Sequence, residues 1–187
     1  DIFNNLNFEV LKNKHTVITG PNGSGKSTLL GLISGLYVPQ SGNIESSSDK
    51  LGYVGVTPLI VDGSLRENLI YGNKNNIKDQ EMMKIINEFS LFDSNELDLN
   101  KKVSINSLSS GQMQKISFIR ALLNNVEILI LDESTSNLDK ETKDLIFELL
   151  KNRNITIINS THNEEDFKYD KHFEIIVEEE NRKLKVN

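Results

Sequence analysis

The feature that most constrains the fold of this chain is a glycine-rich run between a predicted strand and a predicted helix. It reads Gly20-Pro21-Asn22-Gly23-Ser24-Gly25-Lys26-Ser27 and matches the pattern GxxxxGK[S/T] at all four fixed positions. A β-branched run over residues 16–19 precedes it and predicts a buried strand. Apolar residues over 27–36 predict a helix directly after it. This context separates a phosphate-binding loop from a glycine-rich turn that only caps a helix.

Each residue type in the loop suits a bound phosphate. Glycines let the backbone wrap closely around phosphate oxygens, and successive N–H groups at a helix start attract the anion. Lys26 supplies a positive charge to the terminal phosphates. The hydroxyl of Ser27 is a small, hard ligand that suits Mg²⁺. The loop therefore predicts binding of a nucleoside triphosphate together with Mg²⁺.

A second candidate site follows the continuous apolar run over residues 128–131. Asp132 and Glu133 come directly after this run, which is typical of a strand buried inside a parallel sheet. Ligands of open α/β sheets bind at the carboxyl ends of the strands. We expect Asp132 to hold Mg²⁺, usually through water, and Glu133 to act as a general base on the attacking water. Carboxylates also end strands for solubility alone, so the interpretation depends on the phosphate loop.

Hydrophobic patterning predicts a mainly parallel α/β sheet with flanking helices. Strands alternate with helices along the chain, and the last two strands form a closing hairpin. The predicted strands cover residues 6–10, 16–19, 51–54, 128–131, 155–158, 174–177 and 183–186. The predicted helices cover residues 27–36, 110–123 and 138–151, with further helical pattern over 65–97. The strand over 6–10 is expected to belong to an antiparallel β lobe at the start of the domain.

Composition limits the classes of function. The chain has 187 residues, 37% of them apolar, and a net charge of −6, which disfavours a broad nucleic-acid-binding surface. Without cysteine it has neither disulfides nor thiolate metal sites. It has no apolar run long enough to span a membrane and no signal peptide. Because its first residue is Asp1, we expect it to be a piece of a longer protein.

Three further segments complete a resemblance to the nucleotide-binding domains of the ATP-binding cassette (ABC) family. Leu108-Ser109-Ser110-Gly111-Gln112 resembles the family signature, LSGGQ. The segment from Ser134 to Asp139 resembles the stretch that ends in the D-loop, with Asp139 as its carboxylate. His162 follows a predicted strand, where the family has its switch histidine. The run over residues 62–72 resembles a stretch found in exporters.

The resemblance implies an ATPase that converts ATP and water to ADP and phosphate with Mg²⁺. Two cassettes would stack head to tail, and each ATP would lie between one P-loop and the partner's signature motif. His162 and Glu133 would assist hydrolysis beside Lys26. The nucleotide would be bound by Gly20, Pro21, Asn22, Gly23, Ser24, Gly25, Lys26, Ser27 and Thr28, the metal by Ser27 and Asp132, and the partner's nucleotide by Ser109, Ser110, Gly111 and Gln112.

The implied organisation is one nucleotide-binding domain over residues 1–187, with a P-loop core and β lobe at 1–65 and 123–187 and a helical lobe at 66–122. Its partners would be a second nucleotide-binding domain and the transmembrane domain of an exporter, with no nucleic acid. The domain would lie at the cytoplasmic face of a membrane, after an upstream membrane domain. A first strand that carries the adenine-stacking aromatic would precede Asp1.

The chain departs from the family pattern at one functional position. Aligning residues 51–54 with the family's strand places Val56 where the Q-loop has its glutamine. An aliphatic side chain cannot bind Mg²⁺ or hydrogen-bond water, so we expect slow or poorly coupled hydrolysis. Two alternatives to an exporter ATPase stay open: a soluble ABC ATPase that acts on ribosomes or DNA, and a regulatory cassette that binds ATP with weak hydrolysis.

Overall fold

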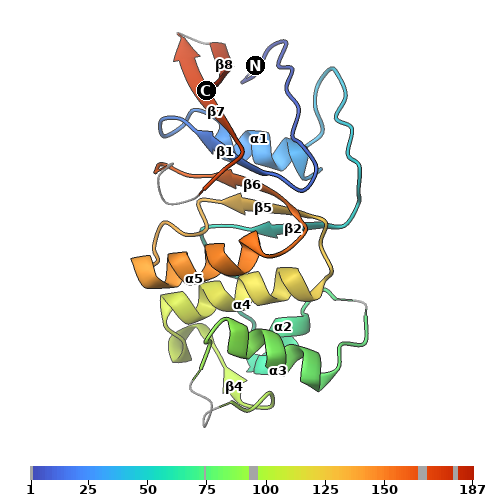
Figure 1. Ribbon diagram of the computed structural model, residues 1–187, viewed down its shortest axis with the longest axis vertical. Coiled ribbons are helices and arrows are strands. Elements are labelled where there is room, and N and C mark those ends of the chain that lie inside the picture. The colour runs from blue at the N-terminus through green and yellow to red at the C-terminus, as the bar shows by residue number, and fades with distance from the viewer. Residues whose placement is uncertain (1, 74, 93–96, 164–167, 179–180) are drawn as a thin grey trace. The chain divides into compact units, whose positions relative to one another are not determined.

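A six-stranded sheet with the strand order β2-β5-β6-β1-β7-β8 forms the centre of the first of two structural units (Figure 1). The structure is a computed structural model that describes residues 2–73, 75–92, 97–163, 168–178 and 181–187. The first unit comprises Asp1–Tyr53, Glu127–Glu133 and Asn154–Asn187, and the second comprises Val54–Val126 and Ser134–Arg153. The expected helical pattern over 65–97 falls partly on residues 74 and 93–96, which lie outside the described residues.

The strands of the large sheet agree with the predicted positions in most cases. Their bounds are β1 His15–Thr19, β2 Leu51–Val54, β5 Ile128–Asp132, β6 Thr156–Ser160, β7 Lys171–Glu178 and β8 Asn181–Val186. Strand β6 pairs in parallel with both β5 and β1, and β1 also pairs in parallel with β7. The β7–β8 pair is antiparallel and forms the predicted closing hairpin. The predicted mainly parallel α/β sheet is therefore confirmed.

The strand expected over residues 6–10 is wrong, because the described residues 2–14 contain no strand. The alternation that suggested it has another cause. Phe3, Leu6, Phe8 and Val10 are each partly buried against the core of the first unit, whereas the residues between them are exposed. An extended segment can bury every second side chain in this way without pairing to a neighbouring strand. The antiparallel pairing in this sheet comes from β7 and β8 instead.

The core of the first unit lies between the sheet and helix α1, Lys26–Ile33. Side chains from β1, β5, β6 and β7 pack against those of the helix. The buried cluster consists of Ile18, Leu29, Leu30, Ile130, Ile158, Phe173 and Ile175. Burial of this apolar surface fixes the position of α1 at the end of β1, and with it the position of the loop that joins them.

The second unit is mainly helical. Its helices are α2 Leu65–Ile70, α3 Asp79–Glu88, α4 Ser110–Leu123 and α5 Lys140–Lys151, with a 3₁₀ turn η2 at Ile105–Ser107. Two short strands, β3 Gly63–Ser64 and β4 Lys102–Val103, pair antiparallel. Helix α4 packs against α2 and α3, and the rings of Phe89 and Phe118 stack at 6.5 Å between centroids. The predicted helix over 110–123 is confirmed at both ends.

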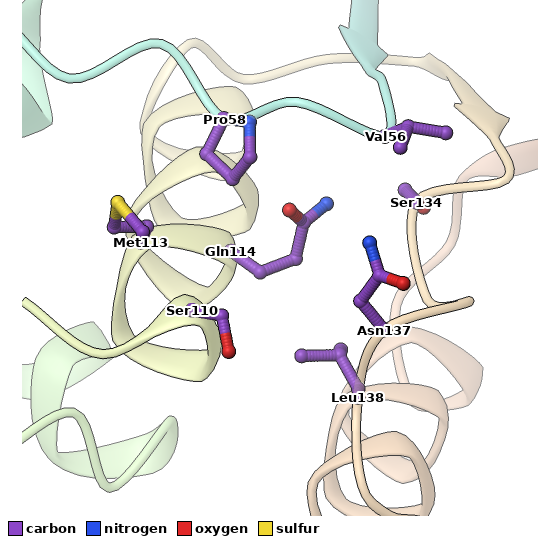
Figure 2. Close-up of a pocket in the computed structure, with 8 residues that line it drawn as sticks. All are labelled: Val56, Pro58, Ser110, Met113, Gln114, Ser134, Asn137 and Leu138. Carbon is purple, nitrogen blue, oxygen red and sulfur yellow. The ribbon is translucent and has the colours of Figure 1, made fainter. Parts of the chain in front are cut away.

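A small pocket of about 60 Å³ lies within the second unit, beside the start of α4 (Figure 2). It is lined by Val56, Pro58, Ser110, Met113, Gln114, Ser134, Asn137 and Leu138. The side-chain amide of Gln114 donates a hydrogen bond to the carbonyl oxygen of Gly55 at 3.1 Å. Helix α4 therefore holds the start of the loop that follows β2.

Asn68 on α2 holds the same loop further along the chain. Its side chain is fully buried, accepts from the N–H of Val61 at 2.9 Å, and donates to the carbonyls of Val61 and Ser64 at 2.9 and 3.1 Å. Asn68→Ala leaves these partly buried backbone groups without their partner, and we expect it to lower the free energy of unfolding by about 1–3 kcal/mol. Urea-induced unfolding measures this change. The exposed Asn76→Ala is the control, and equal stability of the two variants would contradict the prediction.

Candidate active site

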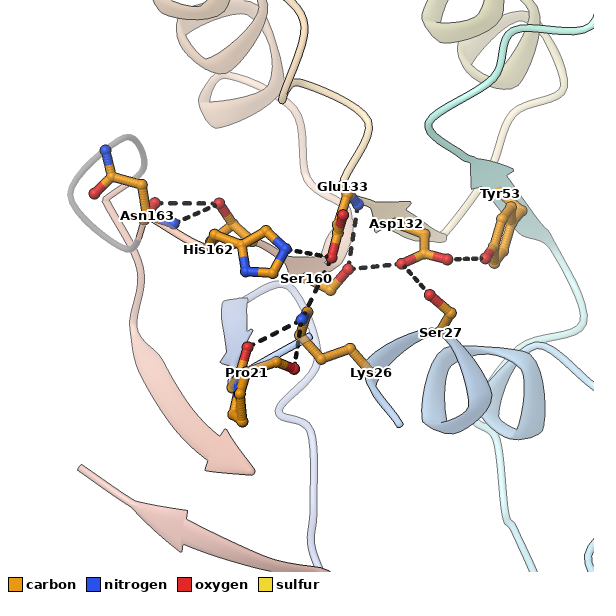
Figure 3. Close-up of polar contacts among 11 residues, drawn as sticks. Pro21, Lys26, Ser27, Tyr53, Asp132, Glu133, Ser160, His162 and Asn163 are labelled. Atoms are coloured by element: carbon orange, nitrogen blue, oxygen red, sulfur yellow. Dashed lines mark hydrogen bonds and ion pairs between the residues drawn. The ribbon is translucent and has the colours of Figure 1, made fainter. Parts of the chain in front are cut away.

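Lys26 stands at the first position of α1 with its ammonium group folded back over the phosphate loop. Its side chain is 4% exposed, and Nζ donates to the carbonyl oxygens of Gly20 at 3.0 Å and Pro21 at 3.3 Å (Figure 3). Gly25 caps the helix with φ at +101°, and an added Cβ would lie 2.9 Å from the ring of Phe3. Only glycine fits there without strain. The loop thus places a positive charge and free helix N–H groups together.

The other residues of the predicted phosphate loop differ in their exposure. Ser24 is buried, whereas Pro21, Asn22, Gly23 and Ser27 are exposed. Ser27 and Thr28 belong to the first turn of α1. Backbone N–H groups of a first helical turn have no partner inside the helix, so they are available to an anion.

Asp132 ends β5 and accepts hydrogen bonds from three hydroxyl groups. Its Oδ1 accepts from Ser27 Oγ at 3.1 Å and from Ser160 Oγ at 2.8 Å, and its Oδ2 accepts from Tyr53 at 2.7 Å (Figure 3). Asp132 and Ser160 are paired residues in the parallel ladder of β5 and β6, so their side chains meet at one edge of the sheet. Asp132 as a whole residue is 9% exposed.

Glu133 adopts a backbone conformation that is uncommon for a residue with a side chain, with φ at +50°. Its N–H lies 3.1 Å from the carbonyl oxygen of Ser160 and 3.2 Å from its hydroxyl. The carboxylate Oε1 lies 2.9 Å from Nε2 of His162 and 3.4 Å from Nζ of Lys26. His162 and Lys26 therefore both contact the same carboxylate oxygen of Glu133, the residue that the sequence predicts as the base.

The Tyr53 phenol remains a hydrogen-bond donor at this site. Partial burial and the hydrogen bond to Asp132 raise the pKa of Tyr53 well above its usual range. The hydroxyl is therefore protonated at neutral pH and donates to the charged carboxylate.

The donor set of Ser27 and Asp132 fits a magnesium ion. A hydroxyl and a carboxylate oxygen 3.1 Å apart are hard oxygen ligands, which Mg²⁺ prefers. The part of the chain that the structure describes holds no group of three or more His, Asp or Glu side chains able to bind a metal. Magnesium fits this small set because it commonly takes one or two protein ligands and fills its remaining positions with water and substrate phosphates.

The predicted signature residues belong to the second unit, at the start of α4. Ser109 is the N-cap: its Oγ accepts from the N–H of Gln112 at 3.1 Å, and its own N–H donates to Gln112 Oε1 at 2.9 Å. Ser109 and Ser110 are exposed, and Gly111 is partly exposed. The side chain of Gln112 is therefore engaged in the cap, while the first-turn N–H groups lie at an exposed helix start that suits an anion.

Asp139, the predicted D-loop carboxylate, also belongs to the second unit. It caps α5: Oδ1 accepts from the N–H of Thr142 at 2.8 Å, and Oδ2 accepts from the Thr142 hydroxyl at 3.0 Å. These bonds hold the pKa of the Asp139 carboxyl below its usual value. Helix α5 consequently begins at Lys140, two residues after the predicted start.

Sequence reasoning missed two residues of the site, Tyr53 and Ser160. Each lies at or next to the end of a strand of the same sheet as Asp132. A signal for Ser160 was present, because it follows the predicted strand over 155–158 and parallel strands end at the same edge of a sheet. Val56 lies two residues after the end of β2, at the expected position. Its side chain is 42% exposed and wholly aliphatic.

Among the described residues, no helix has both the length and the apolar character needed to cross a lipid bilayer.

The chain is similar to proteins of one large group. The family model described as ABC transporter matches residues 3–136, more than half of the chain. ATP-dependent permease MDL1 from Candida albicans is 34% identical over 86% of this chain and 27% of its own length. A multidrug resistance ABC transporter ATP-binding and permease protein from Lactococcus lactis is 30% identical over 84% of this chain and 30% of its own length.

A solved structure supports the same relationship. A bacterial Atm1-family ABC exporter with ATP bound superposes with a TM-score of 0.82 at 25% sequence identity, over 92% of this chain and 34% of the exporter chain. The chain spans about a third or less of the length of these relatives. The match to the family model, the similar relatives and the shared fold agree: this chain belongs to the ABC transporter family.

Proposed function

We propose that this chain is the ATP-binding and ATP-hydrolysing domain that powers an ABC exporter. The observation that carries the proposal is that Lys26 and His162 both contact Oε1 of Glu133. The hydrogen-bonded pair of Ser27 and Asp132 belongs to the same site. The first structural unit therefore contains a lysine that can bind phosphate, two oxygen ligands that can bind a metal and a carboxylate that can act as a base on water. Membership of the ABC transporter family implies ATP binding and ATPase activity in general.

The roles of the individual residues follow from their contacts. Backbone N–H groups of the loop and of the first turn of α1, together with the ammonium of Lys26, bind the phosphates of ATP. Ser27 and Asp132 hold Mg²⁺, which when bound neutralises charge on the phosphate oxygens. Glu133 accepts the proton of the attacking water. His162 donates toward Glu133 or the terminal phosphate and orients the water.

Self-association completes the proposed site. Ser109, Ser110 and Gly111 of a second domain would contact the terminal phosphate in trans, with Gln112 as the last residue of the same signature, which agrees with the place of the two serines at an exposed helix start. Asp139 would lie at the same contact, at the start of α5. The domain would cover residues 1–187, with its helical lobe at 66–122, and act with a transmembrane domain at the cytoplasmic face of a membrane. The relatives with permease and exporter names support this assignment.

Phosphate release from ATP, measured with Mg²⁺ and again with EDTA, tests the proposal. We expect turnover with Mg²⁺ and none with EDTA, together with ATP-dependent dimerisation in analytical ultracentrifugation. Tight ATP binding without phosphate release would contradict the ATPase and favour a regulatory cassette, an outcome that the aliphatic Val56 makes worth testing. Stimulation of turnover by ribosomes or DNA would contradict the exporter role.

A further inference from the structure

The two oxygens of Asp132 are held in different ways. Oδ1 has two hydroxyl donors, Ser27 and Ser160, whereas Tyr53 is the donor to Oδ2 at 2.7 Å. Within the described part of the chain, no other hydrogen bond to Oδ2 is formed. Removal of the phenol hydroxyl would therefore leave Oδ2 without a protein donor, and the carboxylate would be oriented through Oδ1 alone.

The ring of Tyr53 contributes little to the core. Along β2 the residues on either side, Gly52 and Val54, are buried, whereas Tyr53 lies on the other face and is 38% exposed. A tyrosine on this face is not required to fill space. Its hydroxyl makes a charge-assisted hydrogen bond, which is shorter and stronger than a bond between neutral groups. The hydroxyl is thus the part of the side chain that the site uses.

We propose that Tyr53 is a positioning residue of the magnesium site. The proposal rests on the proposed function, in which Asp132 holds Mg²⁺. Tyr53 fixes Oδ2 while Ser27 and Ser160 fix Oδ1, so the carboxylate is oriented before the metal arrives. Partners that orient a metal ligand commonly contribute 10- to 100-fold to metal affinity, roughly. The phenol oxygen also keeps lone pairs that can accept from a metal-bound water.

The substitution Tyr53→Phe removes the hydroxyl and keeps the ring. The probe is Mn²⁺, whose binding in the presence of a non-hydrolysable ATP analogue is followed by electron paramagnetic resonance. We expect Mn²⁺ affinity to fall by about 10- to 100-fold in Tyr53→Phe. Binding of the analogue in EDTA is expected to stay the same, because among the described residues the Tyr53 hydroxyl bonds to Asp132 and makes no hydrogen bond to residues 20–26 of the phosphate loop. Tyr169→Phe, a tyrosine of the same unit placed against His172, is the matched control.

A double-mutant cycle with Asp132→Asn separates orientation of the carboxylate from general damage to the fold. If Tyr53 acts through Asp132, adding Tyr53→Phe to Asp132→Asn lowers Mn²⁺ affinity no further. Mn²⁺ affinity within twofold of the parent in Tyr53→Phe would overturn the proposal, as would an equal loss of metal-free nucleotide binding. Absence of nucleotide binding in the parent protein would instead contradict the proposed function, so the two failures are distinguishable.

Discussion

Glu133→Gln is expected to lower the rate of phosphate release by about 10²- to 10⁴-fold, because an amide cannot accept the proton of the attacking water. The amide oxygen can still accept from His162, and Lys26 keeps its two carbonyl acceptors, so the surroundings of residue 133 change little. ATP is therefore expected to bind and remain unhydrolysed, which traps the dimer. Phosphate release at saturating Mg²⁺ and ATP, with the retained nucleotide identified after gel filtration, measures both effects.

Glu127→Gln provides the matched control. Glu127 directly precedes strand β5 and Glu133 directly follows it, and the carboxylate of Glu127 pairs with the exposed Lys50 at 2.9 Å. The chemical change is identical, but the site lies at the opposite end of the strand. We expect normal turnover in this control. Phosphate release by Glu133→Gln at the parent rate would contradict the assignment of Glu133 as the base.

Lys26→Met is expected to weaken ATP binding by about 10- to 150-fold, which corresponds to the loss of about 1.5–3 kcal/mol for a hydrogen bond to a charged group. Methionine keeps an unbranched chain but has no charge and no N–H donor. The variant thus removes the interaction of Nζ with phosphate together with its bonds to Gly20 and Pro21. Isothermal titration calorimetry with ATP in EDTA measures the affinity without a contribution from the metal.

Two further variants make the Lys26 result specific. Lys14→Met changes an exposed lysine at the other end of β1, where it pairs with Asp170, and is expected to bind ATP normally. Lys26→Arg keeps the positive charge and is expected to lose less affinity than Lys26→Met. An affinity of Lys26→Met within twofold of the parent, in a protein with an unchanged unfolding midpoint, would show that Lys26 does not bind phosphate.

Much of the fold was predictable because its strands are short apolar runs with helices between them. The runs over 16–19 and 128–131 are β-branched or aliphatic throughout, and both lie inside the parallel sheet. The segment over residues 6–10 shows that an apolar pattern alone does not establish a strand. Alternation reports which side chains are buried, but strand pairing also needs a neighbour within hydrogen-bonding distance. Residues 6–10 satisfy the first condition only.

The candidate site was predictable where a contiguous motif specifies it, as at Lys26, Ser27, Asp132 and Glu133. Their mutual contacts were not, because they depend on the register between strands. Ser160 reaches Asp132 because the two residues pair across β5 and β6. Tyr53 reaches it from β2, which carries no motif of its own. Spacing along the chain does not encode which hydroxyl meets which carboxylate oxygen.

At position 133 the backbone conformation favours glycine, whereas the proposed chemistry requires a carboxylate. A side chain in this conformation costs about 1 kcal/mol that glycine would avoid. Selection for a sturdier fold alone would therefore favour glycine there, and the carboxylate would be lost in the same step. Under the proposed role of Glu133 as the base, we expect the residue to persist only while hydrolysis is under selection. A lineage that kept nucleotide binding but no longer needed turnover would be expected to drift toward glycine or asparagine at this position.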